Sequence, residues 1–275
     1  MNRPQIQFLT DGRLHLNHGP IDLVCQAWGS ADAIRCAYDR AVRRFDGLLA
    51  ELVAELPALR SPNTALRGPI AQKMARAVAP FRPAFITPMA AVAGSVAEIV
   101  LAAMVDPGVS RAYVNNGGDI ALHLSAGESL TSAISTSPYR FTIRTADTVR
   151  GIATSGWSGR SFSLGIADSV TVLANTASRA DAAATMIANA VDLPGHPAIR
   201  RAPANTLQSD SDLGARLVTL GVGDLTAPEV ATALDRGLAA ATAFRARGLI
   251  EAAALFLNSD QRILGALPLQ ETEHA

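Results

Sequence analysis

Apolar and polar residues alternate near the start of the chain, which is the pattern of a strand with one buried face. Leu14 and Leu16 alternate with polar neighbours, and residues 21–26 form an apolar run of strand-forming residues shortly afterwards. Asp11-Gly12 precedes Leu14, and this dipeptide is typical of tight hairpin turns. The pattern predicts short paired strands in this region.

The spacing of apolar residues then changes to that of helices. Ser30 is suited to cap a helix over residues 30–56, in which apolar positions recur every three or four residues. A second helix is expected over about residues 68–78. Thr87-Pro88 predicts the start of a third helix, which continues to residue 105 and is small or apolar on nearly every side. We expect this third helix to be buried.

Strands and helices are mixed in the second half of the chain. Thr226 and Glu229 have the spacing of a capping box and predict a helix up to about residue 248. The remaining expected elements are strands over residues 112–115, 120–124, 139–145, 152–155 and 170–174, a helix over 178–191, and a final hairpin over 249–257 and 262–267. Elements interspersed without regular strand–helix alternation favour an α+β fold, and with no linker in the sequence we expect a single domain over residues 1–275.

Composition and charge exclude several classes of protein. Lysine plus arginine and aspartate plus glutamate number 24 each, and no basic run is present, so the sequence has no nucleic-acid footprint. The N-terminal residues lack the apolar core of a signal peptide, and the most apolar stretch, residues 90–105, is too short for a bilayer of about 30 Å. We therefore expect a cytoplasmic protein without a membrane partner.

A polar, glycine-containing segment lies between two predicted strands at Asn115, Asn116, Gly117, Gly118 and Asp119. Its glycines permit positive φ and a close approach of a ligand to the backbone, and its exposed N–H groups could hold an anion. The alternative is an ordinary Asn/Gly/Asp turn that serves only backbone geometry.

A second such segment covers residues 151–161, where a predicted strand opens into a loop rich in hydroxyl groups and glycine. Thr154, Ser155 and Gly156 could hydrogen-bond a phosphate, Arg160 would add charge-assisted bonds, and Trp157 could stack on a planar ring. The alternative is a plain Gly/Ser-rich connection with the tryptophan in the core.

A carboxylate and a hydroxyl lie one helical turn apart at Asp181 and Thr185, so they share a helix face. Hard oxygen ligands of this kind suit Mg²⁺, which keeps other positions for water or phosphate. The alternative is that Ser178 is the N-cap of this helix and Asp181 its partner at the third helical position.

Taken in order, these stretches resemble a known family. DGRLHLNHGPIDL, ITPMAAVAGSVAE, VNNGGDIALHL, GIATSGWSGRSFSLGIADSVTVLA, ADAAATMIANAV and LQSDSDLGARLVTLGVG are similar to the UPF0280 family, which in turn resembles the ApbE-like flavin transferases. The resemblance covers nearly the whole chain up to about residue 223. It implies an ApbE-like fold of mixed sheets with packed helices.

The resemblance also implies a cofactor and a set of site residues. In the transferases, an Asp and a Thr on a helix bind Mg²⁺ beside the FAD pyrophosphate, and FMN is transferred from FAD to a protein threonine. Asp181 and Thr185 match those metal ligands, and Gly117, Gly118 and Asp119 match part of the nucleotide pocket. FAD and Mg²⁺ are therefore the expected cofactors.

The chain departs from the transferases in two places. Ala93 and Glu98 stand where the family's K-G-x-A-x-D stretch has Lys and Asp. Between Ser155 and Val170, the family's H-x-x-D-P-x-T-G element is missing, so FMN transfer to a protein is in doubt. Asp168 could replace the lost carboxylate and, with Arg160, is the candidate catalytic pair.

Three hypotheses for function follow. The first is an ApbE-like enzyme, a flavin-nucleotide transferase or hydrolase, that acts on FAD or a related small molecule. The second is a non-flavin hydrolase or lyase for a small carboxylated metabolite, with Arg160, Asp168, Asn115 and Asp119 as its site. The third is a ligand-binding or assembly protein without catalysis, in which alanine-rich helices pack a homodimer.

Overall fold

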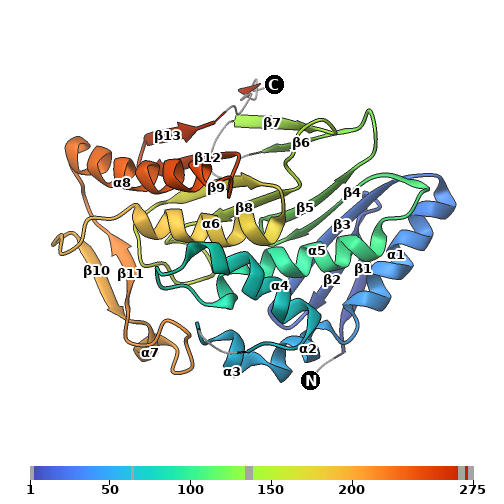
Figure 1. Ribbon diagram of the computed structural model, residues 1–275, viewed down its shortest axis with the longest axis horizontal. Coiled ribbons are helices and arrows are strands. Elements are labelled where there is room, and N and C mark those ends of the chain that lie inside the picture. Colours follow the sequence, from blue (N-terminus) through green and yellow to red (C-terminus); the bar gives the residue numbers. More distant parts are fainter. Residues whose placement is uncertain (1–2, 63–64, 134–138, 266–269, 272–275) are drawn as a thin grey trace.

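The computed structural model describes residues 3–62, 65–133, 139–265 and 270–271, and its centre is a nine-stranded sheet (Figure 1). Every neighbouring pair in this sheet is antiparallel. Its strands, in spatial order, are β1 (Gln5–Phe8), β2 (Leu14–His18), β3 (Ile21–Gly29), β4 (Val109–Asn116), β5 (Asp119–Leu124), β8 (Gly151–Ser155), β9 (Ser169–Ala174), β12 (Ala252–Leu257) and β13 (Asp260–Leu264).

Helices cover one face of this sheet (Figure 1). The longer ones are α1 (Ala31–Phe45), α4 (Pro69–Val78), α5 (Val92–Met104), α6 (Ala177–Ala190) and α8 (Ala227–Ala246). Short helices are α2 (Leu48–Ala54), α3 (Leu56–Leu59) and α7 (Ala204–Leu207), with 3-10 turns η1 (Ala79–Phe81) and η2 (Pro88–Ala91). The predicted α+β class is confirmed.

Two smaller sheets complete the fold. The first pairs β10 (Ile199–Pro203) with β11 (Leu217–Val222), and the second has the order β14 (Gln270–Glu271), β7 (Tyr139–Arg144) and β6 (Ser129–Ala133). Phe141 and Ile143 of β7 are buried in one apolar cluster with residues of β5, β8, β9 and β12. The second small sheet therefore covers part of the large sheet.

The helices on one face of the large sheet and the second small sheet on the other explain the burial pattern of its strands. In β2 and β3 buried and partly exposed residues alternate, because only one face of those strands is closed. In β9 all six residues are buried, which requires cover on both faces and explains its continuous apolar run.

Several predicted elements are confirmed, with shifted ends. The Asp11-Gly12 hairpin joins β1 to β2, and the capping box at Thr226 and Glu229 opens α8. A 3-10 turn, η2, follows Thr87-Pro88 before α5 begins. Positions 266–267 of the predicted last strand lie outside the described residues.

The long helix predicted over residues 30–56 was wrong. Ser30 caps α1 as expected, accepting the N–H of Ala33 at 3.2 Å, but α1 ends at Phe45 and α2 begins at Leu48. Gly47 lies between them with φ of 84°, a left-handed conformation that interrupts the helix at little steric cost. The apolar spacing continues across the break, which is why periodicity alone did not locate it.

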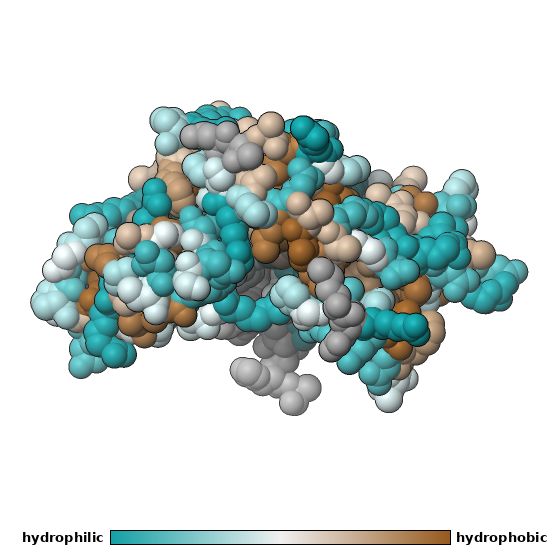
Figure 2. Space-filling model, turned by 90° about the horizontal axis from the view of Figure 1, so that it is seen from below, coloured by the Kyte–Doolittle hydropathy of each residue, from teal (hydrophilic) through white to brown (hydrophobic). Residues whose placement is uncertain are grey.

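Large apolar side chains also reach the surface at scattered positions, which is common in folded proteins. Figure 2 shows one face, on which apolar residues gather near the middle among hydrophilic ones.

Candidate functional site

The turn between β4 and β5 is held by its own side chains. Gly117 and Gly118 have φ of 64° and 112°, and the side-chain oxygen of Asn115 accepts the N–H of Gly118 at 2.8 Å. Asn115 therefore has the role that the turn alternative assigned to it. The N–H of Gly118 is already bonded and is not free to bind an anion.

Strand register sends two of the turn residues toward the helices. Asn116 pairs with Asp119, so their side chains lie on one face of the sheet, while Asn115 and Ile120 lie on the other. The side chain of Asn116 is buried and donates to the carbonyl of Ala93 at 3.1 Å. The turn is thereby fastened to the first turn of α5.

Asp119 is also connected to the neighbouring strand β8. Its Oδ1 accepts the backbone N–H of Thr154 at 3.2 Å, and the hydroxyl of Thr154 bonds that of Thr171 at 2.9 Å. Thr154 thus contributes through its backbone, and its hydroxyl is turned to the next strand.

Asp181 reaches the same region from α6. Its Oδ2 accepts the N–H of Gly94 in α5 at 2.9 Å. Thr176, which accepts the N–H of Arg179 at 3.3 Å, is the N-cap of this helix. The alternative with Ser178 as N-cap and Asp181 at the third helical position is therefore wrong, because the helix starts two residues earlier.

The pKa values of both carboxylates are raised. Burial raises the pKa of Asp119 to about 7, although the N–H of Thr154 and the charge of Arg160 oppose the shift. Burial raises the pKa of Asp181 as well, and the negative charge of Asp119 adds to that rise. Two acidic groups, 62 positions apart in sequence, are therefore close enough in the fold for the charge of one to act on the other.

Arg160 lies against the β4–β5 turn on the side of Asp119. A Cβ atom added to Gly117 would come within 2.9 Å of the guanidinium carbon of Arg160, so the guanidinium rests directly on the glycine. The charge of Arg160 also acts on Asp119. The positive φ at position 117 favours glycine, and the missing side chain leaves room for this contact.

The loop that carries Arg160 is anchored on both sides of its exposed tip. Trp157 donates to Asp168 at 3.1 Å on one side. On the other, Asn189 of α6 accepts the N–H of Leu164 at 2.9 Å and the hydroxyl of Ser163 at 3.3 Å. The helix that presents Asp181 thus also holds the base of the arginine loop.

Three of the predicted site residues lie at the base of this loop. Asp168 accepts Trp157 with one carboxylate oxygen and the N–H of Asn258, at 2.6 Å, with the other. Gly156 packs on the backbone of Asp168, since a Cβ there would lie 2.9 Å from its carbonyl carbon. Ser155 ends β8 opposite Val170. Asp168 thus joins the base of the loop to the turn after β12, and its catalytic role stays a prediction.

Thr185 follows Asp181 by one turn of α6, and both residues are half-buried. Asp119, Asp181 and the Thr185 hydroxyl are hard oxygen donors that suit Mg²⁺. Within the described part of the chain, the two aspartates form a pair and belong to no cluster of three or more His, Cys, Asp or Glu side chains. A cation here would take its other ligands from water or phosphate oxygens.

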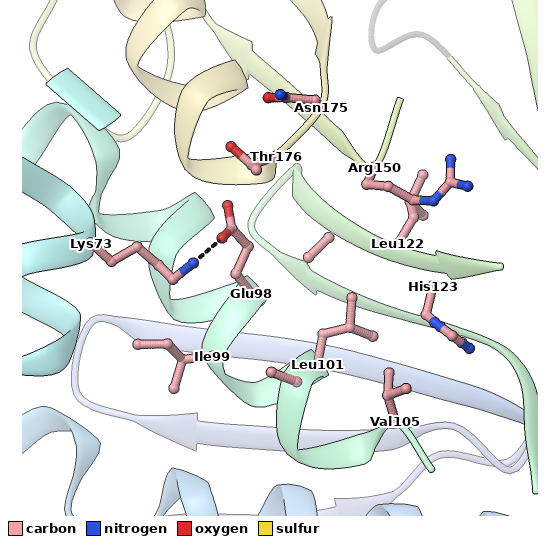
Figure 3. A pocket seen from close by; sticks show the side chains of 12 residues that line it. Lys73, Glu98, Ile99, Leu101, Val105, Leu122, His123, Arg150, Asn175 and Thr176 are labelled. Carbon is pink, nitrogen blue, oxygen red and sulfur yellow. Dashed lines mark hydrogen bonds and ion pairs between the residues drawn. The ribbon is translucent and has the colours of Figure 1, made fainter. Parts of the chain in front are cut away.

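A supporting contact that the sequence did not reveal joins α4, α5 and α6. Glu98 of α5 pairs with Lys73 of α4 (Figure 3) and accepts the N–H of Ser178, in the first turn of α6, at 2.6 Å. Lys73 and Glu98 border an open pocket of about 280 Å³. Lys73 and Glu98 are 25 positions apart, so no local spacing signals their contact.

Replacing Glu98 by alanine should destabilise the protein. The change leaves the Ser178 N–H and the Lys73 ammonium without their partner. Because the pair is only partly buried, we expect a cost of about 1 to 2 kcal/mol, mostly from the unsatisfied N–H. Glu98→Gln keeps an acceptor for the N–H and should cost less. Urea unfolding of both variants measures the difference; equal losses would show that the hydrogen bond to Ser178 is unimportant.

Together, the fold and the site define an α+β protein with a coupled aspartate pair beneath a glycine turn and an arginine loop. The family described as "AbpE bacteria" matches residues 6–265, and this chain belongs to that family.

The chain is also similar to UPF0280 proteins of archaea. It is 37% identical to that of Methanococcoides burtonii over 145 residues, 50% of this chain and 58% of that protein. It is 41% identical to that of Archaeoglobus fulgidus over 106 residues, 38% of this chain and 45% of that protein. The chain thus spans about half the length of the curated relatives it matches.

Among solved structures, the chain is similar to the apo form of the Pseudomonas stutzeri flavinyl transferase ApbE. The two are 14% identical with a TM-score of 0.42, over 99% of this chain and 96% of that one. In the described ranges, no helix has the length and apolar character needed to cross a bilayer.

Proposed function

We propose that this protein binds FAD, or a related small molecule with a diphosphate, together with Mg²⁺ at the Asp119–Asp181 pair. One observation carries the proposal: Asp181 of α6 accepts the N–H of Gly94 next to the residue that fastens the β4–β5 turn, and Asp119 ends that turn, on whose Gly117 an arginine rests. A cation between the carboxylates and an anion beneath the arginine would satisfy both sets of charges. Membership of the ApbE-like family favours a flavin-related ligand.

Each residue has a defined part in this proposal. Asp119, Asp181 and the hydroxyl of Thr185 would hold the cation, which neutralises charge on a phosphoryl group. The guanidinium of Arg160 would move from Gly117 to a phosphate group of the ligand. It would then donate two hydrogen bonds to the phosphate oxygens. The absence of a side chain at Gly117 leaves the backbone open to close approach.

We do not extend the proposal to the transfer of FMN to a protein. Residues 156–168 contain no histidine, and Asp168, the acid in that stretch, is engaged by Trp157 and Asn258.

The non-flavin hydrolase or lyase is less well supported. Of the four residues assigned to it, Asn115 is bonded within its own turn and Asp168 is bonded at the base of the loop. Arg160 and Asp119 remain, and both also belong to the site proposed for the diphosphate.

Calorimetric titration with FAD, with and without Mg²⁺, tests the proposal. We expect binding that needs Mg²⁺, a loss of at least about tenfold in affinity in Asp181→Asn, and no binding of riboflavin, which has no phosphate. Asp235→Asn is the matched control, because Asp235 is an exposed helical aspartate, on α8, that pairs with Arg262 at 2.8 Å.

Two results would count against this function. If FAD binds equally well without Mg²⁺ and in the Asp181→Asn variant, the site does not hold a cation. A lack of FAD binding at millimolar concentration, in a folded protein, would reject the flavin nucleotide and leave a turnover screen to separate the other two hypotheses.

A further inference from the structure

Lys73, on α4, is the single lysine of the chain. Lysine plus arginine number 24, so the other 23 residues of this class are arginine. Elsewhere a carboxylate pairs with arginine, as where Arg44 bonds both oxygens of Glu51 at 2.9 Å. Where a positive charge alone is enough, this chain has arginine, so the lysine at position 73 points to a property that arginine lacks.

The ammonium of lysine differs from a guanidinium in shape. A guanidinium is a planar fork suited to one carboxylate, whereas an ammonium is compact and has three donors that point in different directions. Lys73 donates to Glu98, and its ammonium has no other acceptor among the described residues. Two of its three donors are therefore available to a second acceptor beside Glu98.

A pocket lies beside this ion pair (Figure 3). Lys73 and Glu98 border the open pocket of about 280 Å³, which lies among α4, α5, β5 and the segment before α6. Its apolar lining includes Ile99 and Leu101 of α5 and Ala121 of β5. The pocket thus has room for a short apolar chain next to a charged group.

A second cation on the rim has no acidic partner. Arg150 lies on the opposite side of the pocket from Lys73 (Figure 3). It donates to main-chain carbonyls within residues 145–149, and no carboxylate of the described residues pairs with it. The two cations face the single negative charge of Glu98, and the remaining titratable side chain of the lining, His123, can only add positive charge. One positive charge is left over, which a ligand with one negative charge would balance.

Polar groups at the start of α6 complete the rim. Asn175 and Thr176 line the pocket, and Thr176 is the N-cap of α6, so the partial positive charge of that helix lies at this end. The amide nitrogen of Asn175 has no acceptor in the part of the chain that the structure describes. Both oxygens of Glu98 already accept, one from Lys73 and one from the N–H of Ser178. The rim therefore offers donors and positive charge to an anion.

We propose that this pocket binds a small monocarboxylate with a short apolar chain. The carboxylate accepts hydrogen bonds from the ammonium of Lys73, and the chain lies against Ile99, Leu101 and Ala121. The site goes beyond the function proposed above, because it needs neither the aspartate pair nor a diphosphate.

The single lysine provides a direct reporter of this site. In protein labelled with ¹³C at the lysine ε carbon, only Lys73 gives a signal. At constant ionic strength, butyrate should shift that signal in a saturable way, whereas butyramide, which is similar in size but uncharged, should not. Acetate, which lacks the longer chain, should bind about fivefold more weakly or worse. No saturable shift with butyrate at tens of millimolar, or an equal shift with butyramide, overturns the proposal. The measurement uses neither FAD nor Mg²⁺, so its outcome is independent of the function proposed above.

Substitutions on α4 test the need for lysine, with saturation-transfer NMR of butyrate as the measure of binding. Lys73→Met should bind butyrate about tenfold more weakly or worse. Arg76→Met, which removes an exposed charge from the same helix outside the pocket, is the control and should bind like wild type. Lys73→Arg keeps the charge and a partner for Glu98, so it should unfold in urea like wild type but bind butyrate several-fold more weakly. Binding equal to wild type in either Lys73 variant overturns the proposal.

Discussion

Gly94→Ala should destabilise this protein, although the same change inside a helix is normally stabilising by about 1 kcal/mol. An added Cβ would lie 2.5 Å from the carbonyl carbon of Ala177 and 2.7 Å from the nitrogen of Ser178. Both atoms belong to the backbone of α6, which cannot rotate away as a side chain can. We expect a net loss of about 2 kcal/mol or more in the free energy of unfolding.

The change should also weaken ligand binding, because the N–H of Gly94 holds the carboxylate of Asp181. A shift between α5 and α6 would move that carboxylate relative to Asp119. Ala102→Val, at an exposed position of the same helix, is the control and should cost only about 0.5 kcal/mol. Urea unfolding decides the matter: a Gly94→Ala protein as stable as wild type would show that the two helices are free to separate.

The second large effect concerns pH. Without a divalent cation, the unfolding free energy should fall as the pH rises from about 4 to about 7 and beyond. The pKa values of Asp119 and Asp181 are raised in the folded state, so the folded protein holds protons that the unfolded chain, with an aspartate pKa of about 3.9, has already lost. Their stabilising contribution is complete below pH 4 and is lost as the pH passes the folded pKa.

Asp181→Asn removes one of the two charges and should therefore be more stable than wild type at pH 8, on the order of 2 kcal/mol. At pH 4 the two proteins should be nearly equal. The comparison excludes Glu229, whose pKa is lowered to about 2 by the N–H of Thr226 and by His196, so that it titrates below this window in both proteins. Urea unfolding at several pH values in EDTA gives the result, with Asp235→Asn as control. Parallel pH profiles for wild type and Asp181→Asn would show that the two carboxylates do not interact.

Short sequence motifs predicted many of the helices and strands but did not predict where the elements begin and end. The capping box at Thr226 and the hairpin at Asp11-Gly12 are read from neighbouring residues, and both are present. The break at Gly47 was missed because the apolar spacing continues through it. The start of α6 was placed two residues late because Thr176 and Ser178 are both good caps, and only tertiary packing selects between them.

The sequence predicted individual residues of the site but not that these residues lie close together. Spacing paired Asp181 with Thr185, and glycines marked the turn before Asp119, but nothing local links residues 62 positions apart. Their meeting depends on the register of β4 with β5 and on the close contact of α5 with α6 at Gly94. Asp168 was named as a replacement for the carboxylate of the missing H-x-x-D-P-x-T-G element, and spacing could not predict its hydrogen bonds to Trp157 and Asn258.

The central claim is that Asp119 and Asp181 hold a divalent cation beside a bound diphosphate. The most direct measurement is an anomalous difference map from crystals grown with FAD and Mn²⁺, which replaces Mg²⁺ and scatters anomalously. We expect one strong peak within coordination distance of both carboxylates and of a phosphate oxygen, and no such peak in Asp181→Asn crystals. A peak at other side chains, or a bound diphosphate with no metal between it and the two aspartates, would contradict the claim.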